Sequence, residues 1–276
     1  MKNTVASFQA ARAKQKLSML TAYDFSIAKL IDRSGVNAIL VGDSLGMVML
    51  GYKDTLPVSM EDMISHCASV ARAIENALLV CDMPFMSFQC GIEDTLRNAG
   101  RLLKEGGAEA VKLEGGRDFA PEIRALVRAS IPVMGHIGLT PQSVNAFGGF
   151  KVQGRDLEAA KKIIDDALAV QDAGAFAIVL ECVPSPLAAK ITNMLEIPTI
   201  GIGAGPDCSG QVLVWQDMLG LNQNRSPKFV RRFADLGVQM EKAFTDYVEA
   251  VNNLSFPAQE HSYGMDEKIL QELLEK

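Results

Sequence analysis

Hydrophobic residues in this chain gather in short continuous runs, and the stretches between the runs have the spacing of amphipathic helices. Continuous β-branched and leucine-rich runs without polar alternation are typical of strands that are buried on both faces, as in parallel sheets covered by helices. We expect eight such strands, at residues 17–23, 37–43, 77–82, 110–114, 131–138, 176–181, 198–203 and 211–214.

Helices are expected between these strands. The first is capped by Asp24 and runs to Gly35, and the others lie at 61–76, 93–105, 121–130, 155–174 and 187–195. The strand and helix recur at intervals of roughly 30 residues, which predicts a (β/α)8 TIM barrel. We therefore expect a single barrel domain over residues 1–276, with a C-terminal helical extension from about 228 that opens with one long helix at 228–251.

Two glycine-rich segments, residues 44–58 and 140–154, interrupt this rhythm. Each directly follows a predicted strand and exceeds the usual length of a βα turn. Long loops at strand ends commonly carry function, so both are candidate lids or substrate walls.

Composition and charge exclude several classes of protein. With 48% hydrophobic and 22% charged residues in 276, the chain has enough apolar surface for a sizeable core. A net charge of −6, without a basic stretch interleaved with aromatic residues, argues against a nucleic-acid partner. No apolar run approaches the ~20 residues of a membrane helix, so we expect a soluble protein. Five cysteines without C-x-x-C spacing indicate reduced thiols and a cytoplasmic location.

Five predicted strands end on or beside a residue that can bind a metal or move a proton. Because the loops of a parallel barrel converge at the carboxyl ends of its strands, these residues point to one site. They are Asp43, Asp82, Glu114, His136 and Glu181. Asp43, Asp82 and Glu114 would together form the oxygen-rich site that Mg²⁺ prefers, usually with retained waters. Taken singly, each aspartate is more often only a helix cap.

Lys112 and Glu114 lie two apart on one predicted strand, so their side chains face the same way. They could simply pair with each other. Alternatively, Lys112 is the cation for a substrate carboxylate or a developing oxyanion, and Glu114 is a water-mediated metal ligand. His136 lies among Gly135 and Gly138, where small neighbours leave room for a ligand, although a structural histidine fits the same pattern.

Glu181 follows the apolar run 178–180, a setting that suits a general base, although an ion pair with a lysine is the alternative. The glycine-rich segment 201–205 could bind an anion through its backbone, because barrels often bind phosphate after their last strands. Tight turning explains these glycines equally well.

Seven segments are distinctive sequence motifs: residues 21–24 (TAYD), 41–47 (VGDSLGM), 111–116 (VKLEGG), 135–142 (GHIGLTPQ), 149–154 (GFKVQG), 180–184 (LECVP) and 201–205 (GIGAG). In this order they resemble the ketopantoate hydroxymethyltransferase family, over nearly the whole chain. The resemblance implies a Mg²⁺-dependent barrel of the phosphoenolpyruvate/pyruvate-binding type. Its reaction transfers the one-carbon unit of 5,10-methylenetetrahydrofolate to 3-methyl-2-oxobutanoate, giving 2-dehydropantoate on the pathway to pantothenate and coenzyme A.

Matching motifs assign expected roles to individual residues. The resemblance implies that Asp43 and Asp82 bind the metal and contact the substrate, that Glu114 supports the metal, that Ser44, Lys112 and His136 bind the oxo acid, and that Glu181 accepts the proton. It also implies a cytoplasmic homodecamer. Two positions depart from the family pattern: Ser209 stands where aspartate is commoner, and Gln216 where histidine is commoner. Neither is a proposed catalytic position.

Two other functions remain open. One is a Mg²⁺-dependent carbon-carbon lyase of the phosphoenolpyruvate mutase and isocitrate lyase type, for which we would expect a nucleophilic cysteine in a loop. Cys90 and Cys182 lack such a setting in the sequence. The other is a non-catalytic metabolite-binding barrel, which loss of Glu181 or of an aspartate would indicate.

Overall fold

The protein is described by a computed structural model over residues 2–221 and 227–275. The chain divides into two compact units, and each is described by itself. The larger unit comprises Met1–Met218 with Pro227–Arg231, and the smaller comprises Leu219–Ser226 with Arg232–Lys276. Within the described residues, no helix combines the length and the apolar character needed to cross a membrane.

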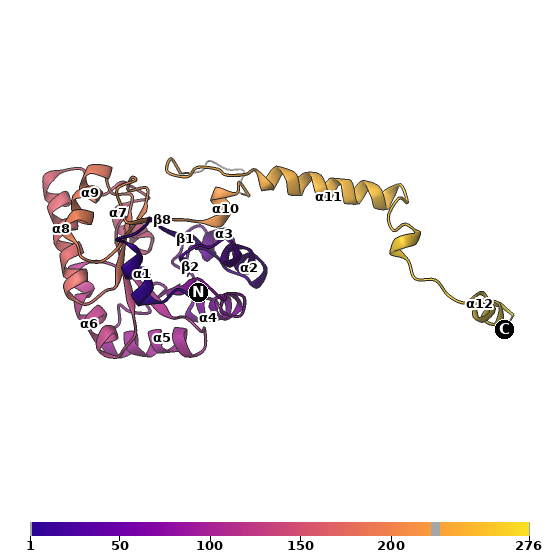
Figure 1. Ribbon diagram of the computed structural model, residues 1–276, viewed down its shortest axis with the longest axis horizontal. Coiled ribbons are helices and arrows are strands. Elements are labelled where there is room, and N and C mark those ends of the chain that lie inside the picture. The colour runs from indigo at the N-terminus through magenta and orange to yellow at the C-terminus, as the bar shows by residue number, and fades with distance from the viewer. Residues whose placement is uncertain (1, 222–226, 276) are drawn as a thin grey trace. The chain divides into compact units, whose positions relative to one another are not determined.

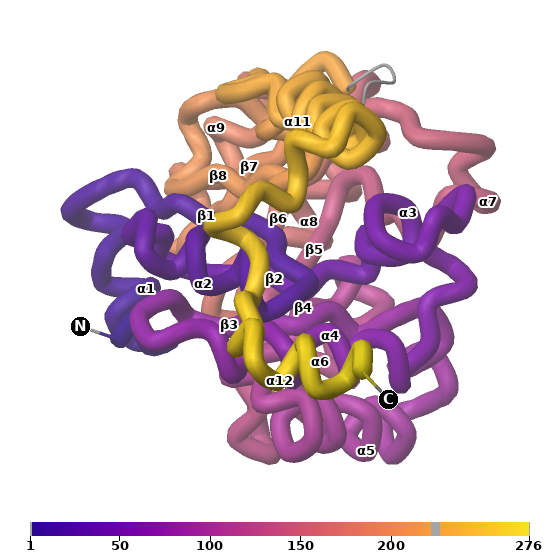
Figure 2. Tube along the Cα trace, turned by 90° about the vertical axis from the view of Figure 1, so that its right-hand side faces the viewer, coloured from indigo at the N-terminus to yellow at the C-terminus, as the bar shows by residue number. Residues whose placement is uncertain are grey.

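The larger unit is a closed barrel of parallel strands. They are β1 (Leu17–Thr21), β2 (Ala38–Val41), β3 (Leu78–Asp82), β4 (Ala110–Glu114), β5 (Val133–Gly138), β6 (Ala177–Glu181), β7 (Thr199–Ile202) and β8 (Gly210–Leu213). Each strand pairs with its neighbours in the chain, and β8 closes the ring on β1. In Figure 2 the labels of the strands gather in the middle of this unit, and those of α1, α5 and α9 lie toward its rim. The predicted (β/α)8 barrel is confirmed.

The outer layer of this unit consists of helices that alternate with the strands (Figure 1). The main ones are α2 (Phe25–Arg33), α4 (Met60–Ala71), α5 (Ile92–Lys104), α6 (Ala120–Arg128), α8 (Leu157–Asp172) and α9 (Ser185–Met194). Three of them begin at side-chain caps, of which the sequence analysis predicts the one at Asp24. Asp24, Ser59 and Asp156 each accept a hydrogen bond from a backbone N–H of the first turn.

The two long loops contain short helices. Residues 44–58 include α3 (Leu45–Val48), and residues 140–154 include η2 (Pro141–Ser143) and α7 (Val144–Phe147). A further short helix, α10 (Trp215–Met218), follows β8. Both loops start at the carboxyl ends of strands, as the sequence predicts.

The register of the strands aligns the chemistry-bearing residues. Asp82 of β3 is paired with Lys112 of β4, and Glu114 of β4 is paired with His136 of β5. Glu181, the last residue of β6, lies beside Gly138 of β5. These pairings place polar residues from four adjacent strands side by side at one end of the barrel.

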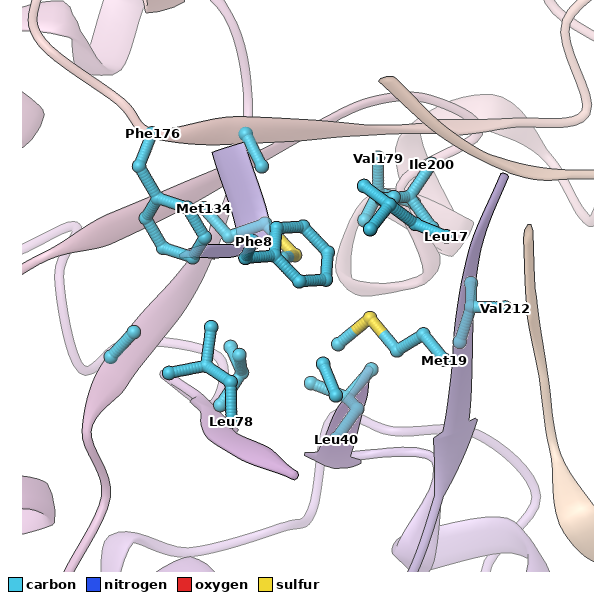
Figure 3. Close-up of a cluster of buried hydrophobic side chains, with 14 residues drawn as sticks. Phe8, Leu17, Met19, Leu40, Leu78, Met134, Phe176, Val179, Ile200 and Val212 are labelled. Atoms are coloured by element: carbon cyan, nitrogen blue, oxygen red, sulfur yellow. The ribbon is translucent and has the colours of Figure 1, made fainter. Parts of the chain in front are cut away.

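The other end of the barrel is closed by apolar side chains. A helix that the sequence reading missed, α1 (Val5–Ala11), places Phe8 in a cluster with residues from the starts of the strands, among them Met19, Leu78 and Met134 (Figure 3). The Phe8 ring meets Phe176 edge to face, with 6.1 Å between ring centroids. Edge-to-face packing of aromatic rings is favourable beyond the area that it buries. This helix therefore seals the amino-terminal end of the barrel.

The smaller unit contains α11 (Leu236–Asn252), η3 (Gln259–His261) and α12 (Glu267–Leu274). The predicted long helix at 228–251 is wrong in its start, because helical structure begins only at Leu236. Phe229 belongs to the barrel unit, where it packs against Gly203 so closely that a Cβ there would lie 2.8 Å from the ring. Tertiary packing thus overrides the helical spacing before residue 236. The single domain with an extension from about 228 stays a prediction.

Candidate active site

The carboxyl ends of β2 to β5 bring five ionisable side chains into one buried cluster. Asp43 lies two residues after β2, Asp82 ends β3, Lys112 and Glu114 are on β4, and His136 is on β5. Each of these residues is at most 5% exposed. Buried charges are stable only when they are paired or hydrogen-bonded, so the pairing within the cluster decides its chemistry.

The two aspartates are joined through the backbone. The Asp43 N–H donates to Asp82 Oδ2 at 3.0 Å. Gly42 permits this approach, because a Cβ at that position would lie 3.3 Å from the same oxygen and 2.8 Å from Ser44 Oγ. Burial, followed by the charges of Asp82 and Glu114, raises the pKa of Asp43 well above its ordinary value. This position therefore favours a cation that offsets the repulsion.

Lys112 pairs with Asp82 rather than with its neighbour on the strand. Its Nζ lies 3.0 Å from Asp82 Oδ1 and 3.1 Å from His136 Nδ1. Burial lowers the pKa of Lys112, but the carboxylates of Asp82 and Glu114 outweigh burial and raise that pKa overall. Among the described residues, the ion pair of Lys112 is therefore with Asp82 and not with Glu114.

His136 has its tautomer set by this lysine. An ammonium group can only donate, so Nδ1 of His136 accepts and its proton lies on Nε2. Burial, followed by the charge of Lys112, lowers the pKa of His136 and keeps the ring neutral. Nε2 lies 3.2 Å from Glu181 Oε2, but the contact does not have hydrogen-bond geometry. The Nε2–H is therefore a buried donor that is available to a ligand.

Glu181 is the most accessible carboxylate of the site, with its side chain 15% exposed. Gly138, at the end of β5, packs tightly against the backbone of Glu181. It has φ +92°, and a Cβ there would collide with the Glu181 carbonyl oxygen. Cys182, directly after Glu181, has φ +49°, a backbone conformation that residues other than glycine rarely adopt. Its N–H donates to Ile202 O at 2.9 Å, which helps to hold the turn.

Glu114 is held through one oxygen. Its Oε2 accepts the Gln142 backbone N–H at 2.9 Å, whereas its Oε1 lies 3.4 Å from His136 Nδ1, which carries no proton to donate. Burial raises the pKa of Glu114 to about 8. The sequence placed Glu114 near the metal, and the structure places it beside the two aspartates but already engaged with protein groups.

The donor set fits a hard cation with few protein ligands. Asp82 Oδ1 is buried and has no well-formed hydrogen bond, although it lies beside the charged Lys112 nitrogen. Oxygen ligands from one or two carboxylates, completed by water and substrate, are what Mg²⁺ usually takes in enzymes. Within residues 2–221 and 227–275, no three His, Cys, Asp or Glu side chains are arranged as a complete ligand set.

Sequence reasoning assigned no role to two residues that contact the site. The hydroxyl of Tyr23, which is fully buried, lies 2.9 Å from Ser44 Oγ and orients that partly exposed serine. Gln142 Nε2 donates to Asp43 Oδ2 at 2.9 Å and to Met83 O at 2.9 Å. A polar residue in the first turn after β5, four positions beyond the strand, was the signal for Gln142.

The glycine-rich segment 201–205 is explained by packing. A Cβ at Gly201 would lie 3.0 Å from Cys208 Sγ, one at Gly203 would meet Phe229, and one at Gly205 would collide with Ser185. The tight-turn interpretation of these glycines is therefore sufficient.

The two departures from the family pattern lie outside the carboxylate cluster. Ser209 Oγ accepts the Thr199 N–H at 3.2 Å, and Thr199 Oγ1 accepts the Ser209 N–H at 3.1 Å. Gln216 Nε2 donates to Met49 Sδ at 3.2 Å. Ser209 thus contacts β7, and Gln216 contacts the loop at 44–58.

Comparison with known sequences gives one consistent result. The family model described as ketopantoate hydroxymethyltransferase matches residues 2–259. The 3-methyl-2-oxobutanoate hydroxymethyltransferase of Clostridium novyi (strain NT) is 61% identical over 274 residues, covering 99% of this chain and 100% of the relative. The enzyme of the same name from Enterococcus faecalis (strain ATCC 700802 / V583) is 58% identical with the same coverage.

Solved structures with similar folds are more distant in sequence. A 2,3-dimethylmalate lyase, a member of the PEP mutase/isocitrate lyase superfamily, has a TM-score of 0.60 at 16% identity and covers 100% of both chains. A phosphonopyruvate hydrolase in complex with oxalate and Mg²⁺ has a TM-score of 0.58 at 12% identity, covering 94% of this chain and 93% of that one. At these identities the likeness shows the barrel fold alone.

Proposed function

Because the chain belongs to the ketopantoate hydroxymethyltransferase family, we propose that it transfers the one-carbon unit of 5,10-methylenetetrahydrofolate to 3-methyl-2-oxobutanoate. The product is 2-dehydropantoate, on the pathway to pantothenate. One observation carries the mechanism: a buried cluster of carboxylates, a lysine and a neutral histidine lies next to the more accessible Glu181 at one barrel mouth.

In this proposal Asp43 and Asp82 hold Mg²⁺ directly, and Glu114 supports it through water. Two observations support this assignment. The pKa of Asp43 is raised, and Asp82 Oδ1 is buried without a well-formed hydrogen bond, so a bound cation would stabilise both carboxylates. When bound, Mg²⁺ supplies a Lewis acid that polarises the keto group of the oxo acid and acidifies its C3–H.

The oxo acid is bound by Ser44, Lys112 and His136. Lys112 places a full positive charge at the cluster, which offsets the charge of the substrate carboxylate. The Nε2–H of His136 donates to a substrate oxygen, since the described residues leave that donor without a hydrogen bond. Ser44 contributes a hydroxyl whose orientation depends on Tyr23.

Glu181 is the proposed general base. It removes the C3 proton of the bound oxo acid, and the resulting carbon nucleophile attacks the methylene carbon of the folate as one C–N bond of that carbon breaks and its nitrogen takes the proton. Once the carbon-carbon bond has formed, water breaks the other C–N bond: its hydroxyl stays on the methylene carbon as the hydroxymethyl group and its proton goes to the nitrogen, which releases tetrahydrofolate. A positioned base of this kind contributes on the order of 10²–10⁴ in rate. Glu181 suits this role because it is the more exposed carboxylate and lies 3.2 Å from the ring nitrogen of His136, which is a proposed ligand of the oxo acid.

The loops at 44–58 and 140–154 are the proposed walls that exclude water until the carbon-carbon bond has formed. Both are tied to the cluster, because Ser44 opens the first loop and Gln142 lies near the start of the second. A homodecamer in the cytoplasm, as in the family, completes the proposal, and the five free thiols accord with that location.

A lyase of the same superfamily is disfavoured by its missing nucleophile. Burial, followed by the charge of Glu181, raises the pKa of Cys182 to about 11, so its thiolate is scarce near neutral pH. Cys90 is exposed, and its thiol donates to Met86 O at 3.7 Å on its own loop. A binding module without catalysis is disfavoured because the whole charged cluster and Glu181 are present together.

Product analysis tests the proposal. With Mg²⁺, 3-methyl-2-oxobutanoate and 5,10-methylenetetrahydrofolate, the protein should form 2-dehydropantoate and tetrahydrofolate in equal amounts. EDTA should abolish turnover and excess Mg²⁺ should restore it. Cleavage of an added 2-alkylmalate or isocitrate, without product from the oxo acid, would favour the lyase, and absence of both reactions would favour the binding module.

A further inference from the structure

Gln142 occupies a position from which it contacts three of the strand ends. It is the central residue of η2 (Pro141–Ser143), the first turn of the loop after β5, and it is 6% exposed. Pro141 restricts the backbone at the start of this turn, and Thr140 O accepts the Ser143 N–H at 2.8 Å. The turn therefore delivers the Gln142 side chain to a defined place.

The amide of Gln142 is fully used as a donor. One Nε2 hydrogen goes to Asp43 Oδ2 and the other to Met83 O, each at 2.9 Å. The opposite orientation of the amide would set its oxygen against a carboxylate and a carbonyl, both acceptors, so the partners dictate the orientation. Oε1 faces the side chain of Gln89, whose Nε2 donates to it at 3.4 Å.

The backbone of Gln142 adds a third link. Its N–H donates to Glu114 Oε2 at 2.9 Å. One residue thus connects the loop at 140–154 with Asp43 after β2, Met83 after β3 and Glu114 at the end of β4. Within the described residues, the Asp43 carboxylate accepts one hydrogen bond, and the Gln142 amide donates it.

A neutral amide has a specific advantage at this place. It orients a carboxylate through one oxygen without neutralising its charge, whereas a lysine or arginine would compete with a cation for it. The second oxygen of Asp43 stays free for a ligand. Preorganising a carboxylate in this way lowers the cost of binding, as outer hydrogen bonds do at metal sites.

We propose that Gln142 is a positioning residue of the reaction: its amide orients the Asp43 carboxylate toward the bound cation and couples that carboxylate to the loop at 140–154. This inference rests on the proposed function. It predicts that removal of the amide weakens cation binding and raises the Mg²⁺ concentration that turnover requires, with little effect on the rest of the barrel.

Gln142→Met is the most direct test, because methionine has nearly the same length and no amide. Calorimetric titration of the metal-free protein with Mg²⁺, repeated with Mn²⁺ as a second probe, should give a dissociation constant raised by roughly tenfold, as expected for a lost hydrogen bond to a charged group. The Mg²⁺ concentration for half-maximal turnover should rise by a similar factor. At saturating Mg²⁺, kcat should recover to within about threefold of the unaltered protein.

The matched control is Gln153→Met. Gln153 lies in the same loop, and its Nε2 donates to Lys151 O at 3.0 Å without touching a carboxylate. This variant should bind both metals as the unaltered protein does. Gln142→Leu, of different shape but equally unable to donate, carries the same expectation as Gln142→Met and serves if methionine impairs folding.

The possible outcomes separate the two proposals. If the unaltered protein binds Mg²⁺ and is active, unchanged metal affinity in folded Gln142→Met or Gln142→Leu overturns the role of Gln142 and leaves the proposed function intact. A lowered melting temperature with unchanged metal affinity would mean a merely structural residue, and it overturns the inference as well. If the unaltered protein fails to bind Mg²⁺, both proposals fall.

Discussion

The two ends of the barrel interior are built from the same eight strands and have opposite chemistry. At the amino-terminal end, apolar side chains such as Phe8, Met19 and Leu78 fill the space. At the carboxyl end, Asp82, Lys112 and their partners occupy equally buried positions. Packing stabilises the first end, whereas the second carries unfavourable burial of charge that only pairing and ligands offset.

This contrast indicates a division of labour along each strand. The apolar end contributes stability through the area and volume that it buries. The charged end does not, since burial raises the pKa of both Asp43 and Glu114, which means that their ionised forms are less favourable in the folded protein. Changes at the two ends should therefore separate activity from stability, and the following predictions are ordered by the size of that separation.

Glu181→Gln should affect activity most. The substitution is nearly isosteric, so Mg²⁺ and the oxo acid should still bind, but turnover should fall by roughly 10²–10⁴, the usual contribution of a general base. Steady-state kinetics at saturating substrate measures the loss, and thermal unfolding should be nearly unchanged. Glu158→Gln, the same substitution on the exposed face of α8, is the control. An activity of Glu181→Gln close to that of this control would remove Glu181 from its role.

Phe8→Ala should produce the reverse pattern. Truncating a fully buried phenylalanine typically costs about 3–5 kcal/mol, because it removes apolar contacts and leaves a cavity. Chemical denaturation should show this loss, while kcat and Mg²⁺ affinity stay near normal wherever the variant is folded. Phe25→Ala truncates a half-exposed ring and should cost far less. Loss of metal affinity in folded Phe8→Ala would contradict the independence of the two ends.

Asp43→Asn should weaken Mg²⁺ binding by roughly tenfold or more, because it removes a formal charge from a hard-cation site. The metal-free variant should nevertheless unfold at a temperature at least as high as the unaltered protein, since burial and the charges of Asp82 and Glu114 raise the pKa of Asp43. Calorimetry measures both properties. Asp165→Asn, beside Arg117 on the outer surface, changes the same charge and should leave metal affinity unaltered. A metal-free Asp43→Asn protein that is clearly less stable would refute the proposed repulsion.

The smallest effect concerns pH. Burial raises the pKa of Glu114 from 4.5 to about 8, so the folded protein holds a proton there that the unfolded chain has lost between these values. Stability of the metal-free protein should therefore fall as pH rises from about 5 to 8. In Glu114→Gln this part of the decline should be absent. Melting temperatures of both proteins across that range, by calorimetry, test it, and parallel curves would contradict the assignment.

The sequence predicted the barrel because its strands are continuous apolar runs whose pattern depends on local burial. It also predicted that Asp43, Asp82, Glu114, His136 and Glu181 converge, because parallel strands share one carboxyl edge. The pairing of Lys112 was harder to predict. Lys112 on β4 pairs with Asp82 on the preceding strand, β3, and only the register between these two strands decides that.

Other features depended on contacts that sequence spacing does not contain. Phe8 closes the barrel from a helix before β1, and its partner Phe176 is 168 positions later in the chain, so local patterning gave no sign of it. Gln142 matters only because the turn after β5 folds back over Asp43. The start of α11 was misplaced because Phe229 packs on Gly203 instead of continuing the helical spacing.

The central claim is that the charged end of the barrel abstracts the C3 proton of the oxo acid with the metal and Glu181 alone. The most direct measurement is exchange of that hydrogen in deuterated water, followed by NMR, with Mg²⁺ and 3-methyl-2-oxobutanoate but no folate. We predict exchange by the unaltered protein and by Phe8→Ala, exchange slowed by roughly 10²–10⁴ in Glu181→Gln, and none in EDTA. Exchange at the normal rate in Glu181→Gln would contradict the account, as would its absence in the unaltered, Mg²⁺-loaded protein.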